Sequence, residues 1–136
     1  MQAEPDNDLA RTIVGLAMKV HRQLGSGFLE AVYRNALAFE LRKTQMSFEC
    51  HPTLAVMYEG IEVGIYQADL IIEGSLVVEL KVVSALSDEN MAQLVNYLTA
   101  TKIENGLLLN FGARSLEFRT KTRTYQLRHE APNLHS

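Results

Sequence analysis

The sequence predicts one α/β domain with a mixed β-sheet and flanking helices, in the order α-α-β-β-β-α-β-β. Residues 9–43 repeat their apolar side chains at helical spacing, whereas from Pro52 onward the period changes to the alternation of β-strands. A further helical segment at about 88–101 separates two strand-like runs. A helix that connects two neighbouring strands of one sheet makes them parallel, because the chain must cross back over the sheet.

The first two elements are expected to be helices. Asp6 or Asp8 can cap the first one, and the glycine-containing turn 25–27 ends it. This Gly-x-Gly follows no strand and lacks the rest of a GxGxxG motif, so it indicates a helix–helix connection rather than a phosphate cradle. The second helix is predicted over about 28–43. Its expected buried residues are Leu29, Val32, Ala36, Leu37 and Leu41.

Strands fill most of the remaining chain. Alternating apolar residues predict a hairpin at 54–58 and 61–65, with Gly64 as a bulge or bend. The helix at 88–101 has an apolar stripe that consists of Met91, Leu94, Val95 and Leu98. The closing strands are expected at 106–110 and 116–119.

Composition is ordinary for a soluble globular protein, with 47% hydrophobic and 21% charged residues. No apolar run approaches the ~20 residues of a membrane span, and the acidic start of the chain is unlike a secretion signal. Cys50 is the only cysteine, which excludes an internal disulfide, and no Cys/His cluster has zinc spacing. We therefore expect a cytoplasmic protein with one domain over 1–128 and a frayed tail at 129–136.

Charge is segregated along the chain. The formal net charge is −3, and between Lys43 and Lys81 there is no Lys or Arg. A dedicated duplex-binding protein usually carries a basic footprint, which this chain lacks as a whole. Basic residues gather in the N-terminal helices and near the C-terminus, where Arg119 and Lys121 are candidates for contacts with nucleic acid. The alternative is that this basic face is merely solvated.

The most informative stretch consists of two apolar runs, 68–72 and 76–83, on either side of a short turn. Asp69 lies on the first run, and Glu79 and Lys81 lie on the second. Ionised groups on buried strands are costly unless they are paired or bind a cation. Three such groups along one hairpin therefore indicate a site.

The length of the turn decides whether both acids share a face of the sheet. A two-residue loop would leave Asp69 and Glu79 on opposite faces. A three-residue loop, 73–75, pairs Ile72 with Leu76 and sets Asp69 opposite Glu79, with Cβ atoms about 4.5–5.5 Å apart. We predict the three-residue loop, because the alternative would bury two isolated charges on opposite faces.

Four motifs, taken in order, resemble those of a known family. Asp69 followed by a hairpin and the Glu-x-Lys of 79–81 resembles the signature of the PD-(D/E)xK nuclease superfamily. The run GFLEAVY at 27–33 fits the GxxExxY pattern that names one family within it, and QLVNY at 93–97 fits the QxxxY element of its exonuclease-like branch. LLLNFG at 107–112 resembles that family's closing strand. The resemblance covers nearly the whole chain and implies a restriction-endonuclease-like core.

The resemblance implies a site that binds Mg²⁺ or Mn²⁺ and hydrolyses phosphodiester bonds, with oxygen ligands that suit such ions. The metal ligands would be Asp69, Glu79, the backbone carbonyl of Leu80, and Glu30 from the second helix. Lys81 would hold the attacking water or the phosphate. Gln93 and Tyr97 would contact the phosphate or orient the site.

Two interpretations from different classes remain. The first is a metal-dependent nuclease that acts on DNA. The second is a non-catalytic or partner-dependent binding or regulatory module, in which Glu79 and Lys81 form a structural ion pair with Asp69. The small size and the absence of a basic stripe favour a homodimer or a protein partner. The complete set of Glu30, Asp69, Glu79 and Lys81 favours the catalytic interpretation.

Overall fold

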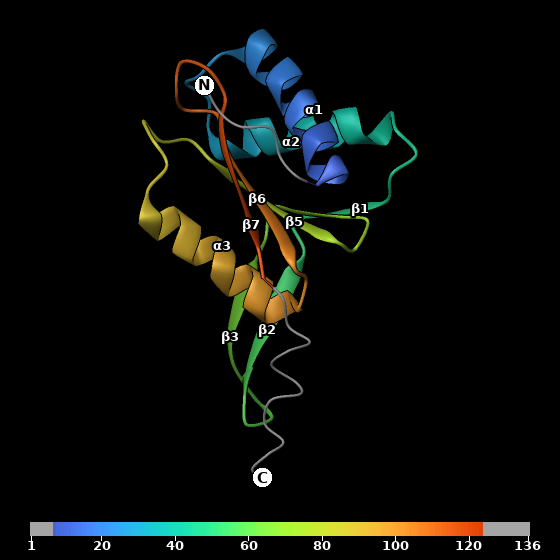
Figure 1. The fold of residues 1–136 in the computed structure, drawn as a ribbon, viewed down its shortest axis with the longest axis vertical. Coiled ribbons are helices and arrows are strands. Elements are labelled where there is room, and N and C mark those ends of the chain that lie inside the picture. The colour runs from blue at the N-terminus through green and yellow to red at the C-terminus, as the bar shows by residue number, and fades with distance from the viewer. Residues whose placement is uncertain (1–6, 124–136) are drawn as a thin grey trace.

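The computed structural model describes residues 7–123. In chain order their helices and strands are α1 (Asp8–Leu24), α2 (Glu30–Arg42), β1 (Phe48–Cys50), β2 (Thr53–Tyr58), β3 (Ile61–Gln67), β4 (Leu70–Ile72), β5 (Leu76–Lys81), α3 (Asp88–Thr101), β6 (Asn105–Asn110) and β7 (Glu117–Thr122). They form three layers, in which α1 and α2 pack on one face of a five-stranded sheet and α3 packs on the other (Figure 1). The predicted α/β class is therefore confirmed.

The sheet has the strand order β1-β4-β5-β6-β7 and is mixed, as predicted. β5 and β6, which α3 connects, are parallel, and the other neighbouring pairs are antiparallel. Five strands precede α3 where the sequence analysis expected three. The extra strands arise because β1 is only three residues long, too short to show a period, and because the central hairpin supplies two strands.

Side chains alternate along β5, so its two faces contribute to separate hydrophobic cores. Leu76, Val78 and Leu80 pack in the core under α1 and α2, whereas Val77 packs in the core under α3. By the same alternation Glu79 shares the face of Val77. A strand that is buried on both faces leaves little water for a charge, so the Glu79 carboxylate is costly unless it is compensated.

The helix α2 buries Leu37 and Leu41 as predicted, with Ala36 partly buried, but the two predicted residues nearest its start are exposed. It begins at Glu30, so Leu29 lies outside the helix and is 79% exposed, and Val32 is also exposed. The buried stripe consists of the predicted Leu37 and Leu41 together with Tyr33, and these residues are spaced four apart. The Tyr33 ring anchors this stripe because it stacks on Phe111 of the same core, with ring centroids 4.6 Å apart.

The helix caps follow local hydrogen-bond chemistry. Asn7 and not Asp8 caps α1, because its Oδ1 atom accepts the hydrogen bond from Ala10 N at 3.0 Å, and Asp6 lies outside the described residues. Asp8 forms the first turn, where an acid suits the helix dipole. The helix α3 begins with a capping box in which Ser87 and Asn90 satisfy each other's backbone N–H groups.

The strands β2 and β3 form a hairpin of their own that extends from the rest of the molecule (Figure 1). The predicted irregularity near Gly64 is present, because the register shifts between Val56, which faces Gly64, and Met57, which faces Glu62. Most side chains of this hairpin are exposed. Its base contacts α3 through an edge-to-face pair of Tyr66 with Tyr97, with ring centroids 5.1 Å apart.

Among residues 7–123 the structure has no helix that is long and apolar enough to cross a membrane. The predicted tail at 129–136 lies outside the described residues.

Candidate active site

The turn between β4 and β5 has the predicted register. Ile72 pairs with Leu76 and Leu70 pairs with Val78, which confirms the three-residue connection. Glu73 and Gly74 both adopt positive φ angles, of 56° and 62°. For Glu73 this conformation is unusual, and its side chain holds it in place: Glu73 Oε2 accepts a hydrogen bond from Ser47 N at 2.6 Å.

This register brings the two acids of the hairpin together. Asp69 is 4% exposed and Glu79 is 3% exposed, so both carboxyl groups are removed from solvent. Asp69 N donates a hydrogen bond to Glu79 Oε2 at 3.2 Å, and Leu80 N donates to Asp69 Oδ2 at 2.8 Å. Each acid is thus held by the backbone of the other strand, and the predicted convergence of Asp69 and Glu79 is observed.

The electrostatics of the pair favour a bound cation. Burial, followed by the nearby Asp69 charge, raises the pKa of the Glu79 carboxyl to about 9. Burial also raises the pKa of Glu30 to about 7, with a further contribution from its hydrogen bond and charge interaction with Asp69. Negative charge is therefore crowded where α2 meets the hairpin. A divalent ion would relieve this crowding by replacing the protons that the acids retain.

Lys81 and Gln93 contact each other at the end of β5. Lys81 Nζ donates a hydrogen bond to Gln93 Oε1 at 2.8 Å, so a residue of α3 orients the lysine at the end of β5. Tyr97, which was expected to contact the phosphate or to orient the site, contacts the backbone of the segment that leads to Asp69. Its hydroxyl donates to the carbonyl of Gln67 at 3.3 Å, two residues before Asp69. Burial, followed by the Glu79 and Asp69 charges, raises the pKa of Tyr97 to about 12, so its hydroxyl keeps its proton.

Sequence analysis did not identify Arg34 as a site residue. Its Nη1 atom lies 3.0 Å from Asp69 Oδ1 and 4.0 Å from Glu30 Oε2. The available signal was its position four residues after Glu30, which places both side chains on one face of a helix. Its partner Asp69 lies thirty-five residues away, and no local pattern connects them.

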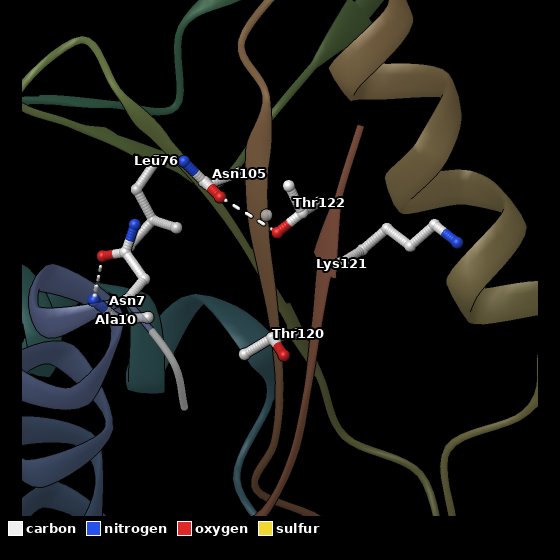
Figure 2. Close-up of a pocket in the computed structure, with 8 residues that line it drawn as sticks. Asn7, Ala10, Leu76, Asn105, Thr120, Lys121 and Thr122 are labelled. Carbon is white, nitrogen blue, oxygen red and sulfur yellow. Dashed lines mark hydrogen bonds between the residues drawn. The ribbon is translucent and has the colours of Figure 1, made fainter. Parts of the chain in front are cut away.

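Arg119 and Lys121 do not join these residues. Both lie on β7, which is separated from β5 by β6. Arg119 donates a hydrogen bond to the Leu86 carbonyl at 3.2 Å. Lys121 borders a cavity of about 220 Å³ whose other lining residues include Asn7, Asn105 and Leu76, the first residue of β5 (Figure 2). This cavity therefore lies at the opposite end of β5 from Lys81.

The donor set fits a hard divalent cation, but the site is not already arranged around one. Carboxylate and carbonyl oxygens from Asp69, Glu79, Leu80 and Glu30 are the ligand types that Mg²⁺ and Mn²⁺ prefer. Within the described part of the chain, however, no group of three His, Cys, Asp or Glu side chains has the arrangement of a metal site. The Asp69 carboxylate is instead engaged by Arg34 and by Leu80 N.

A mixed sheet between helices, with buried acids and a lysine on its central hairpin, defines a restriction-endonuclease-like domain with an acidic site. The family model of the PD-(D/E)XK nuclease superfamily matches residues 7–122, and the chain belongs to this superfamily. A solved structure titled "Crystal structure of SSO0001" is similar in fold, with a TM-score of 0.56 and 18% identity. The match covers 73% of this chain and 52% of that one, so this chain spans about half its length. No curated protein matches the chain.

Proposed function

We propose that the protein is a divalent-metal-dependent nuclease that hydrolyses phosphodiester bonds in DNA. The observation that carries this proposal is the convergence of buried Asp69 and Glu79 on one hairpin, with Lys81 at the end of the same strand. The superfamily match supports the same class of activity. Arg34 pairs with Asp69, but a second buried carboxyl group beside this pair is difficult to explain as a stabilising feature of the core, because burying an additional acid next to Asp69 destabilises the folded state.

Each residue of the site has a chemical role in this proposal. Asp69, Glu79 and the Leu80 carbonyl would hold the ion, with Glu30 completing the set. The ion, when bound, supplies a Lewis acid that polarises the phosphate and lowers the pKa of water. Lys81, oriented by Gln93, holds the attacking water against the phosphorus or neutralises the phosphate oxygens. Tyr97 acts indirectly, because its hydroxyl holds the backbone at Gln67, two residues before Asp69.

The fold around Glu30 supports membership of the GxxExxY family. Gly27 has a φ angle of 133°, a conformation that residues with a Cβ rarely adopt. The Tyr33 hydroxyl donates a hydrogen bond to the Gly25 carbonyl and accepts one from Phe28 N. The glycine and the tyrosine of the motif thus fix the loop that starts α2, and this loop places Glu30 beside Asp69.

One observation favours the alternative of a binding or regulatory module that retains the nuclease fold. Arg34 already forms an ion pair with Asp69, so part of the acidic cluster is neutralised without metal. The net charge of −3 also means that tight binding to nucleic acid would benefit from a second protein or a second copy of the chain. This alternative predicts folding and partner binding without hydrolysis.

Purified protein incubated with single-stranded, duplex and branched DNA, and with RNA of matched sequence, distinguishes these functions. Cleavage should require Mg²⁺ or Mn²⁺, stop in EDTA, and disappear in Glu79→Ala. Glu62→Ala, which removes an exposed acid of the β2–β3 hairpin, is the matched control and should cleave normally. Cleavage by Glu79→Ala at the wild-type rate would exclude this site as the catalytic centre.

A further inference from the structure

Arg34 forms an ion pair with Asp69 inside the acidic cluster. Its guanidinium group contacts Asp69 Oδ1 at 3.0 Å and lies 4.0 Å from Glu30 Oε2. The Arg34 side chain is 15% exposed and that of Asp69 is 5% exposed, so the pair is largely shielded from water and salt. A guanidinium group stays charged at any pH that a protein survives. A fixed positive charge is therefore built into the acidic cluster.

The two oxygens of Asp69 are held in different ways. Oδ2 accepts its hydrogen bond from Leu80 N, a backbone donor that the hairpin fixes. Oδ1 accepts from a long side chain on a separate element, α2, which can leave by rotating about its own bonds. An ion that coordinates Asp69 at Oδ1 therefore needs only one side chain to move. Arg34 is that side chain.

We propose that Arg34 is the counter-cation of the metal-free site, that a divalent ion displaces its guanidinium group from Asp69, and that the released group then binds a substrate phosphate. This inference rests on the proposed function. Displacement follows from charge, because a divalent cation bound to Asp69 repels a guanidinium group 3.0 Å from the same carboxylate. The second role follows from shape, because the planar fork of arginine matches two phosphate oxygens.

The consequence is an ordered site. While no ion is bound, Asp69 retains the guanidinium group, and the site offers the substrate one fewer phosphate contact. Once the ion is bound, Arg34 becomes available beside Glu30, close to where the phosphate must lie. Metal binding and phosphate binding are thereby coupled through a single side chain.

Calorimetric titration with Mn²⁺ in the absence of substrate tests the first step. Arg34→Gln should bind Mn²⁺ about tenfold more tightly than wild type, because the competing charge is gone. Arg42→Gln, which removes an exposed arginine of the same helix, should match wild type. An Arg34→Gln protein that binds Mn²⁺ equally or more weakly overturns the inference and leaves the proposed function intact. If none of the three proteins binds Mn²⁺, the proposed function and the inference fail together.

Binding of a single-stranded oligonucleotide tests the second step. The affinity is measured in Mn²⁺ by fluorescence anisotropy with the Lys81→Met protein, which should bind the oligonucleotide without cleaving it. Adding Arg34→Gln should weaken this affinity about tenfold, whereas adding Arg42→Gln should not. Unchanged oligonucleotide affinity in the Arg34→Gln protein overturns the phosphate role.

The wild-type protein provides a measurement that does not depend on any variant folding. The ¹⁵N-detected Nε–H signal of Arg34 should shift when Mg²⁺ saturates the site, while that of Arg42 stays in place. A structural ion pair would leave the Arg34 signal unmoved, and that result would overturn displacement by the metal.

Discussion

Replacing Glu79 with glutamine should change how the stability of the metal-free protein depends on pH. The carboxyl group is 3% exposed, and its pKa in the folded protein is about 9, against an ordinary value of 4.5. Between these two values the folded state retains a proton that the unfolded chain has released. The retained proton stabilises the folded state. This contribution to the free energy of unfolding is complete below about pH 4.5 and is lost progressively as pH rises toward 9.

The size of the effect follows from this linkage. One proton changes the free energy of unfolding by about 1.4 kcal/mol for each pH unit in this window. From pH 6 to 8 the upper limit of this change is about 2.7 kcal/mol, and we expect about 2 kcal/mol because the Glu79 carboxyl interacts with nearby charges and does not titrate as an isolated group. Glutamine has the shape of the protonated acid and no charge to desolvate. Glu79→Gln should thus match wild type near pH 5 and become more stable above it.

The assay is thermal or urea unfolding in EDTA, followed by circular dichroism at pH values from 5 to 9. A difference of about 2 kcal/mol corresponds to roughly 8 °C in melting temperature for a chain of this size. Taking the difference between the two proteins cancels the titration of the groups that they share. Glu62→Gln is the exposed control and should follow wild type. If the curves of wild type and Glu79→Gln stay parallel from pH 6 to 8, the reasoning about Glu79 is refuted.

Other predictions concern metal, catalysis, nucleic acid and backbone packing. Wild type should gain about 2.7 kcal/mol in stability at a Mn²⁺ concentration one hundred times the dissociation constant, and Glu79→Ala should lose most of this gain in a thermal-shift assay. Lys81→Met should abolish turnover yet leave Mn²⁺ affinity in calorimetry nearly unchanged, and a large loss of affinity would contradict its assigned role. Lys121→Ala should make the plot of log binding constant for DNA against log salt concentration less steep, by the amount expected for about one lost phosphate contact. An unchanged slope would mean that this residue is merely solvated. Gly112→Ala should cost about 2–3 kcal/mol in urea unfolding, because its Cβ would lie 2.5 Å from the backbone of Val83; a cost near zero would refute that packing.

The hairpin and its acids were predictable because strand alternation is strict. Once 73–75 is a three-residue loop, the spacing from Asp69 to Glu79 determines that they meet. The first turn of α2 was not predictable in this way. Leu29 and Val32 are apolar and were expected to be buried, but the helix starts at Glu30, and Tyr33, which packs on Phe111, is the residue buried at this end.

Arg34 was missed for a related reason. An arginine on an amphipathic helix is usually solvated, and only the three-dimensional path of α2 past the hairpin reveals its partner. The strand β1 was missed because three residues do not establish a period. Strand alternation thus predicted which residues meet on one hairpin. Contacts between separate helices and strands could be identified only from the structure.

The short connection between β4 and β5 also affects how the protein folds. Asp69 and Glu79 are ten residues apart in sequence, so closing the loop between them costs little chain entropy, and hairpins of this kind form within about 1–10 μs. The parallel pairing of β5 with β6 needs the whole α3 crossover and comes later. We therefore expect the two acids to approach each other before the helices that cover them have docked. Their mutual repulsion acts on the early, partly formed chain, and it opposes folding itself as well as the stability of the finished site.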